Sequence, residues 1–329
     1  MVESPMLTAR VPPSPWRSTF KPPVVMPSFK LDSLHTKHLL GRGMEAHVYA
    51  LDEARVIKIY QRLTPLDHLQ SLQHFYNNLD TKAIPYALPR IEKISREDER
   101  LYTIEKRLYG RNMEHVSREV DAPTLEHLLH RYLEALQGFS AVIFTSPLTH
   151  YKLFDEYSIS ETGQGDWHTF LARYIRRRVE VTRPCLRRDV RGLSDKLHLL
   201  NQILSHPYTG KYSVIHGDFF PGNLLVDENL NITGLLDFGL FTMFGEHLFD
   251  VATACVFFDM YDQLGQNIRQ RLLTLAQKTY GPSVLGILYR YILIYSLISA
   301  NIYTPDCSDG HYQWCVENLN NPVYWEEIR

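Results

Sequence analysis

Hydrophobic and polar residues follow one pattern in the first third of the chain and another in the rest. Residues 56–60 (VIKIY) and 101–108 (LYTIEKRL) are rich in β-branched and aromatic side chains, which predicts two short strands. Between them, residues 65–79 place apolar side chains at the spacing of one helix face: Leu69, Leu72, Phe75, Tyr76 and Leu79. A strand-rich first part that carries one helix is therefore expected.

After about residue 124 the apolar positions recur at the three- and four-residue spacing of helices. This pattern predicts helices over residues 124–142, 166–181, 193–205, 246–260, 264–279 and 284–302. Short strands are predicted among them at residues 212–215, 224–226 and 232–236, the last two joined by a polar turn. We therefore expect a bilobal α+β architecture, with a small β-rich lobe over residues 31–108, a larger α-helical lobe over residues 109–329, and a cleft at the join.

The composition is that of a globular protein behind an extended tail. Residues 1–30 contain seven prolines and no apolar core of a secretion signal, which predicts an extended segment. The chain as a whole has 44% hydrophobic and 22% charged residues. None of the four cysteines lies in a close pair of the kind that binds zinc, so we expect reduced thiols in a cytoplasmic protein.

Charge and hydropathy argue against two classes of partner. The formal net charge of −2 gives no general attraction to nucleic acid or to an anionic membrane. The most apolar stretch, residues 284–300, carries Arg290 in its middle, where a charge in lipid would be costly, so we expect a buried helix. Arginines cluster between Arg173 and Arg191, which we interpret as a solvated helix face, with a nucleic-acid surface as the alternative.

Candidate chemistry begins in the first lobe with two glycines, Gly41 and Gly43. They suit a hairpin loop over phosphate groups, because glycine lets backbone N–H groups approach oxygens without a Cβ clash. Lys58 follows inside a predicted strand, on the face opposite Ile57 and Ile59, where its ammonium would neutralise nucleotide phosphates. Taken alone, these features also fit a plain tight turn and an exposed lysine. A downstream motif decides between the two interpretations.

Residues 216–223 read HGDFFPGN and place the carboxylate of Asp218 five residues before the carboxamide of Asn223. Asp237 follows Asn223 by 14 residues, at a predicted strand end, and begins a DFG sequence. Phosphoryl transfer needs a carboxylate that orients the attacking hydroxyl and hard oxygen ligands that hold Mg²⁺. Since the predicted hairpin brings Asn223 and Asp237 side by side, the spacing favours a phosphoryl-transfer site over ordinary turn residues.

These motifs resemble those of the aminoglycoside phosphotransferase and choline kinase-like family, a branch of the protein-kinase-like fold. The resemblance covers residues 39–255, and residues 216–223 match the family's catalytic loop as they stand. It implies a catalytic set and a pair of metal ligands, His216 with Asp218 and Asn223 with Asp237.

The resemblance extends to two further segments. Residues 245–252 (GEHLFDVA) match another family stretch, in which Asp250 resembles the aspartate that braces the catalytic loop. The strand end at residues 105–108 corresponds to the hinge that meets adenine through its backbone. This adds Glu105, Arg107 and Leu108 to the expected nucleotide site, beside Gly41, Gly43 and Lys58.

Two departures from the protein kinases bear on function. Asp250 follows Asp237 by only 13 residues, which leaves no room for an activation segment with an Ala-Pro-Glu element and favours a small-molecule acceptor. The helix after Lys58 lacks the glutamate that pairs with this lysine in kinases. Its replacements would be Asp67, Gln70 or Gln73.

The residues and the resemblance together predict an ATP-dependent O-phosphotransferase that uses Mg²⁺. Its acceptor would be a hydroxyl of a small molecule, such as an aminoglycoside-like, choline-like or sugar alcohol. The alternative is a catalytically weak kinase-like module that binds nucleotide or ligand. Aromatic residues near the C-terminus would suit a cationic or ring-bearing acceptor, or else belong to the core: Tyr289, Tyr291, Tyr295, Tyr303, Tyr312, Trp314, Tyr324 and Trp325.

Overall fold

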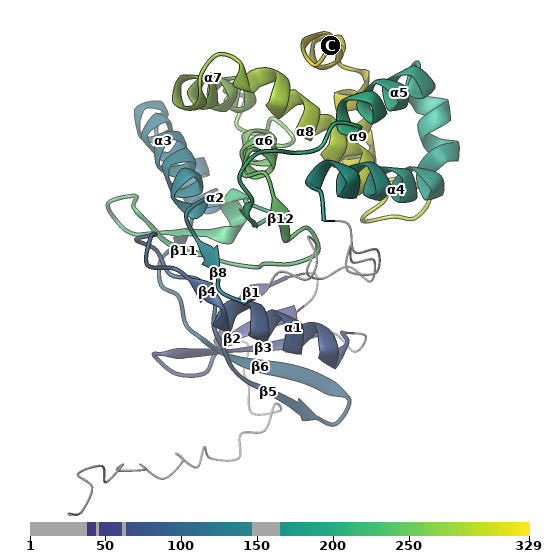
Figure 1. Cartoon of the computed structure of the whole chain (residues 1–329). Coiled ribbons are helices and arrows are strands. Elements are labelled where there is room, and N and C mark those ends of the chain that lie inside the picture. The colour runs from purple at the N-terminus through teal and green to yellow at the C-terminus, as the bar shows by residue number, and fades with distance from the viewer. Residues whose placement is uncertain (1–37, 44–45, 61–63, 147–164) are drawn as a thin grey trace, which may run out of the picture.

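The computed structural model describes residues 38–43, 46–60, 64–146 and 165–329. The extended tail expected over residues 1–30 lies outside these described residues. The described chain forms two lobes, a sheet with one helix below and a set of helices above (Figure 1).

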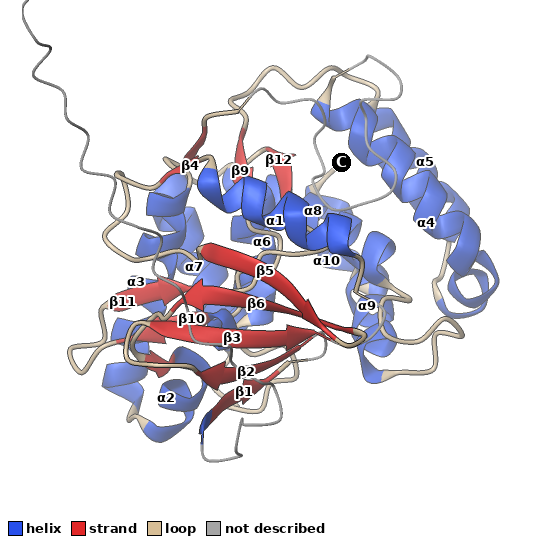
Figure 2. Cartoon of the chain, turned by 90° about the horizontal axis from the view of Figure 1, so that it is seen from below, coloured by secondary structure: helices blue, strands red, loops and turns tan. Residues whose placement is uncertain are grey.

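The N-lobe is an antiparallel five-stranded sheet with the strand order β1-β2-β3-β6-β5 (Figure 2). Its strands are β1 (Leu39–Arg42), β2 (Ala46–Ala50), β3 (Arg55–Tyr60), β5 (Ile91–Glu97) and β6 (Arg100–Lys106). Helix α1 (Leu66–Asn77) buries Leu69, Leu72 and Phe75, as the apolar spacing predicts. Leu69 packs against the sheet in a small separate core that contains Ala46, Tyr60 and Leu101.

The C-lobe is built around α8 (Val284–Ser299), which is buried along most of its length and packs most extensively against four other helices. These neighbours are α6 (Leu248–Phe257), α9 (Gly310–Asn320), α4 (Trp167–Asp189) and α10 (Pro322–Glu327). The other helices are α2 (Met113–Glu119), α3 (Ala122–Phe139), α5 (Leu193–Leu204) and α7 (Ile268–Tyr280). In Figure 1, α3 and α7 lie on one side of the lobe, and α4 and α5 on the other.

Short strand pairs lie between the helices and the N-lobe. A three-stranded sheet joins β11 (Ile232–Leu235), β10 (Leu224–Val226) and β7 (Arg111–Asn112). Two further pairs are β9 (Ser213–Ile215) with β12 (Met243–Gly245), and β4 (Leu79–Asp80) with β8 (Ile143–Phe144). A 3₁₀ turn, η4 (Pro221–Asn223), connects the loop after β9 to β10.

The α+β, bilobal, protein-kinase-like fold expected from the sequence is confirmed, and the six predicted C-lobe helices are present with shifted ends. The largest shift is in α4, which continues past residue 181 and through Pro184 to Asp189. Sequence patterns missed the strands β4, β5, β7, β8 and β12 and the helices α2, α9 and α10.

Arg290, the charge within the most apolar stretch, lies on α8 and faces Glu246 at 3.8 Å. Its side chain is 17% exposed, and its guanidinium also lies 5.2 Å from the ring centroid of Tyr291. The ion pair and the ring allow this helix to carry a charge inside the lobe. None of the helices in the described part of the chain has both the length and the apolar character needed to cross a membrane.

Candidate active site

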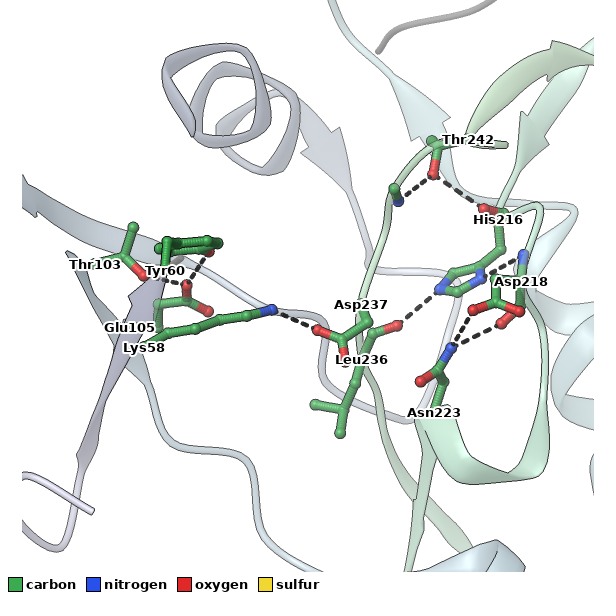
Figure 3. A network of polar contacts seen from close by, with 11 residues as sticks. Lys58, Tyr60, Thr103, Glu105, His216, Asp218, Asn223, Leu236, Asp237 and Thr242 are labelled. Carbon is green, nitrogen blue, oxygen red and sulfur yellow. Dashed lines mark hydrogen bonds and ion pairs between the residues drawn. The ribbon is translucent and has the colours of Figure 1, made fainter. Parts of the chain in front are cut away.

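The loop between β9 and β10 carries Asp218 toward the space between the lobes, where its carboxylate is accessible to solvent (Figure 3). Asn223 holds this carboxylate, because its Nδ2 donates to Asp218 Oδ2 at 2.9 Å and to the Asp218 carbonyl at 3.0 Å. Desolvation by the surrounding protein raises the pKa of Asp218 to about 6, although the hydrogen bond from Asn223 acts to lower it. Since the Asn223 amide nitrogen is turned to Asp218, its oxygen is left to face other groups.

The imidazole of His216 links the loop to the backbone of Leu236. Its Nδ1 lies 3.2 Å from the Asp218 amide, which donates to it, and its Nε2 lies 2.8 Å from the carbonyl of Leu236. These two partners require a neutral ring that carries its proton on Nε2. Burial lowers the pKa of His216 to about 4, which keeps the ring in this neutral form.

The side chain of Asp250, near the start of α6, binds the backbone of the same loop. One carboxylate oxygen accepts the His216 amide at 2.7 Å and the other accepts the Gly217 amide at 2.8 Å. The side chain is fully buried, and burial raises the pKa of Asp250 to about 7 although both N–H donors favour the ionised carboxylate. Asp250 thus fixes the loop immediately before Asp218.

Gly217 is the point where the segment after Asp237 crosses the loop. Its φ is +80°, and a Cβ at this position would lie 2.1 Å from the carbonyl oxygen of Phe241. The next residue of the crossing segment, Thr242, donates its hydroxyl to the His216 carbonyl at 3.0 Å and accepts the Gly239 amide at 3.0 Å. Asp237 and Asp250 are 13 positions apart, and the segment between them is packed directly on the loop at Phe241 and Thr242.

The strand pair β10–β11 brings Asn223 next to Asp237, as the hairpin predicted. Leu224 pairs with Leu235, and the Leu236 amide donates to the Asn223 carbonyl at 2.7 Å. Asp237, two residues beyond the end of β11, has a φ of +49°, a left-handed conformation that a short polar residue tolerates.

Lys58 reaches Asp237 from strand β3. The Lys58 Nζ lies 2.7 Å from Asp237 Oδ1 (Figure 3). Burial alone would lower the pKa of Lys58, but nearby negative charge, first that of Asp237, raises it well above its ordinary value. The Lys58 ammonium in turn holds the pKa of Asp237 below its ordinary value.

None of the three helix residues offered as partners for Lys58 makes the contact seen at Asp237. The Gln73 amide donates instead to the Ile91 carbonyl at 3.2 Å. Asp67 and Gln70 lie on the exposed side of α1. Within the described residues, the ion pair of Lys58 is therefore made across the lobes and not within the N-lobe.

The hinge residues 105–108 differ in whether their backbone amides already donate a hydrogen bond. The Lys106 amide donates to Arg90 and the Arg107 amide to Ala54, at 3.0 and 2.8 Å. Among the described residues, no backbone hydrogen bond takes up the amide of Leu108. Glu105 still belongs to β6, and its buried side chain accepts hydrogen bonds from Thr103 and Tyr60.

The glycines of the first hairpin have open space above them. A Cβ at Gly41 would meet nothing within 4 Å, and one at Gly43 would meet only the Ala46 carbonyl at 3.4 Å. The Gly43 amide donates to that same carbonyl at 2.9 Å. The tip of the hairpin, residues 44–45, lies outside the described residues.

Two supports of the site were missed by sequence reasoning. The ring of Phe238 lies 4.4 Å from that of His216, 5.3 Å from Phe75 and 5.6 Å from Tyr76, so it connects the loop to helix α1. The buried hydroxyl of Tyr132 on α3 donates to the Phe219 carbonyl and, at 3.2 Å, to that of Ala254. The DFG sequence could have indicated the role of Phe238, whereas nothing in the local sequence indicates that of Tyr132.

The C-terminal aromatic residues are mostly core. Seven of the eight are at most 7% exposed, namely Tyr289, Tyr291, Tyr295, Tyr312, Trp314, Tyr324 and Trp325. Tyr303 is the exception, at 53% exposed. Partial desolvation of its hydroxyl, and then the charge of Asp218, raise the pKa of Tyr303.

The site offers oxygen ligands of the kind that Mg²⁺ takes. A carboxylate from Asp237 and the free amide oxygen of Asn223 are hard donors, and magnesium commonly completes its shell with water and substrate phosphates. No group of three or more His, Cys, Asp or Glu side chains within the described ranges is placed to hold a metal ion. The residues present therefore fit a magnesium ion that is shared with a nucleotide.

Fold and site together define a phosphotransferase of the protein-kinase-like class. A family model described as the phosphotransferase enzyme family matches residues 38–285, and the chain belongs to that family. The resemblance predicted from the motifs is thereby confirmed. No curated protein sequence matches the chain.

Solved structures with the same fold share little sequence with this chain. Aminoglycoside phosphotransferase APH(4)-Ia has a TM-score of 0.61 at 17% identity, covering 88% of this chain and 93% of that one. The GDP complex of wild-type aminoglycoside 2′-phosphotransferase-IIIa has a TM-score of 0.58 at 17% identity, with 88% and 91% covered. The gentamicin–APH(2″)-IIa complex has a TM-score of 0.54 at 15% identity, with 86% and 90% covered. At these identities the likeness shows the fold alone.

Proposed function

We propose that the protein is an ATP-dependent kinase that transfers the γ-phosphate to a hydroxyl of a small molecule. The observation that carries this proposal is the convergence of Asp218, Asn223 and Asp237 on one site, with Lys58 reaching it from the other lobe. Phosphoryl transfer depends on positioning and on neutralising charge, and these four side chains supply both. The nucleotide-bound relatives, among them GDP and ADP complexes, support a nucleotide donor.

Each residue has a role that follows from its position. Asp218 accepts a hydrogen bond from the acceptor hydroxyl, orients it and takes its proton. Asn223 and Asp237 would hold Mg²⁺, which would neutralise charge on the transferred phosphate. Lys58 binds the phosphates, and the open hairpin at Gly41 and Gly43 covers them.

His216 and Asp250 act through the backbone and are positioning residues. The neutral His216 ring holds the Asp218 amide, and Asp250 holds the two amides before it. At the hinge, the unengaged amide of Leu108 is the donor that a purine edge would meet, while the Arg107 amide is already bonded. Glu105 and Arg107 would therefore contribute to adenine binding through their carbonyl groups.

The acceptor is a small molecule with a free hydroxyl. The short segment after Asp237 supports this class, and relatives are complexed with gentamicin, kanamycin and streptomycin. The hydroxyl of an aminoglycoside-like, choline-like or sugar alcohol could reach the Asp218 carboxylate, which is accessible to solvent. After partial desolvation, the charge of that carboxylate also raises the pKa of the exposed Tyr303.

The test is an ADP-release screen with ATP and with GTP across amino sugars, macrolides, choline analogues and sugars. We expect Mg²⁺-dependent turnover with at least one acceptor class, abolished by Asp218→Asn while nucleotide affinity changes less than threefold. Nucleotide binding without turnover on any acceptor would favour the catalytically weak binding module instead. Full activity of Asp218→Asn on the best acceptor would refute the assignment of the base.

A further inference from the structure

Glu105 is a buried carboxylate on the same face of the sheet as Lys58. Lys58 pairs with Thr103 across strands β3 and β6, and Val56 pairs with Glu105 two residues along. Because side chains alternate between faces, Lys58, Thr103 and Glu105 all project from one face. Figure 3 shows the Glu105 carboxylate beside the aliphatic part of Lys58, and Glu105 is only 8% exposed.

The hydrogen bonds that Glu105 accepts come from neutral groups. The Thr103 hydroxyl donates to Glu105 Oε1 at 2.5 Å, and the Tyr60 hydroxyl lies 3.5 Å from the same oxygen. The Tyr60 ring also lies 5.7 Å from the Lys58 ammonium, so one side chain borders both charges. A buried carboxylate needs a cation nearby to offset its desolvation, and the strand pairing places Lys58 on this face two residues along from the partner of Glu105.

Under the proposed function, Lys58 cannot depend on Asp237 alone. Asp237 would share its carboxylate with Mg²⁺, and Lys58 would turn toward the phosphates. In kinases a helix glutamate then holds the lysine, but helix α1 has its Gln73 bonded to Ile91, with Asp67 and Gln70 exposed. The lysine therefore needs a carboxylate from another element.

We propose that Glu105 is this carboxylate, a positioning residue on strand β6 that holds Lys58 against the nucleotide phosphates. The inference rests on the proposed function and deepens it by naming the group that replaces the helix glutamate. Thr103 and Tyr60 both bond to Oε1 of Glu105 and so orient its carboxylate. The negative charge of Glu105 also contributes, after those of Asp237 and Tyr60, to the raised pKa of Lys58.

Binding measurements separate this role from two others. By titration calorimetry, Glu105→Gln should weaken Mg·ADP roughly ten- to a hundredfold, the range of one charged hydrogen bond, and leave adenosine within twofold. Equal weakening of adenosine and ADP would mean that Glu105 contacts the base, and unchanged ADP affinity would mean that it is only structural. Either result overturns the proposal. Glu99→Gln, at an exposed carboxylate in the turn between β5 and β6, is the matched control and should bind ADP as the wild type does.

A double-mutant cycle tests whether Glu105 acts through Lys58. In a Lys58→Met background, Glu105→Gln should have less than a twofold further effect on ADP affinity, whereas an independent role would give the full loss again. Glu105→Asp should recover part of the affinity because it keeps the charge. If Glu105→Gln does not fold, Thr103→Val removes the orienting hydrogen bond and should weaken ADP severalfold with adenosine unchanged; an unchanged ADP affinity would overturn the proposal.

The same measurements keep the two proposals apart. A wild-type protein that binds no nucleotide contradicts the proposed function and this inference with it. A wild type that binds and turns over ATP, beside a Glu105→Gln variant of equal ADP affinity, leaves the proposed function intact and rejects the inference alone.

Discussion

Gly217 and Phe241 lie so close that a methyl group on residue 217 would be 2.1 Å from the Phe241 carbonyl oxygen. Gly217 also has a φ of +80°, which side chains disfavour. The two constraints explain why glycine stands between His216 and Asp218, where protein kinases have arginine. The short segment after Asp237 takes up the space that a side chain would need.

Replacing Gly217 should therefore damage both stability and activity. We expect Gly217→Ala to lower the free energy of unfolding by about 3 kcal/mol or more, from backbone strain plus a backbone clash. Gly265→Ala is the matched control, since Gly265 has a φ of +59° and open space around it. Its cost should be about 1 kcal/mol, from strain alone. Equal losses for the two variants in urea unfolding would contradict the packing argument.

Asp250 should resist even an isosteric replacement. In Asp250→Asn the amide NH₂ would face one of the two backbone N–H donors and leave it buried without an acceptor, which costs about 1–3 kcal/mol. Because these amides precede Asp218, we also expect kcat to fall at least about tenfold. The control is Asp259→Asn, at a partly exposed carboxylate that also accepts two amides. A variant of Asp250 with wild-type stability and kcat would show that the bracing is dispensable.

His247 gives the clearest dependence of stability on pH. Burial lowers its pKa from 6.5 to about 4, and one nitrogen lies 3.2 Å from the Tyr280 hydroxyl. Between these pH values the unfolded chain binds a proton that the folded protein does not, so the contribution of this histidine is lost as the pH falls from about 6.5 to about 4. The stability difference between wild type and His247→Gln should shift by about 3 kcal/mol over that window, with the wild type losing more. Parallel pH curves from urea unfolding would contradict this.

Metal and nucleotide should stabilise the protein together. At a ligand concentration of a hundred times Kd, Mg·ADP would add about 2.7 kcal/mol to the free energy of unfolding, which a thermal shift detects. We expect chelation of Mg²⁺ or the Asp237→Asn change to remove most of this shift. Asp227→Asn, at the polar turn between β10 and β11, should retain it. A full shift in the absence of Mg²⁺ would argue against a metal held by Asp237.

Local sequence patterns predicted the elements whose apolar spacing is regular, such as α1 and α8, and failed where packing sets the outcome. Pro184 is a helix breaker by local preference, yet α4 continues through it and buries Leu186. Helix α9 has polar residues on its buried side, and His311 bonds to Ser299 on α8. Because such hydrogen-bond partners lie on another element, the local sequence does not predict them.

The site divides in the same way. The spacing within residues 216–223 and the hairpin to Asp237 specified which groups meet, because strand pairing translates spacing into distance. The pairing of Lys58 with Asp237 spans 179 residues, and no spacing rule reaches that far. The sequence did not predict that Glu105 lies near Lys58, because the resemblance assigned residues 105–108 to binding of the purine base.

The packed segment between Asp237 and Asp250 also bears on how turnover would be controlled. Its single hydroxyl side chain, Thr242, is fully buried and bonded at both ends, so a modifying enzyme would have to unpack the segment to reach it. The loop that carries Asp218 is thus held from this side by the segment packed on it. Under the proposed function, we therefore expect activity to depend on the amounts of protein and acceptor, and not on modification of a side-chain hydroxyl in this segment.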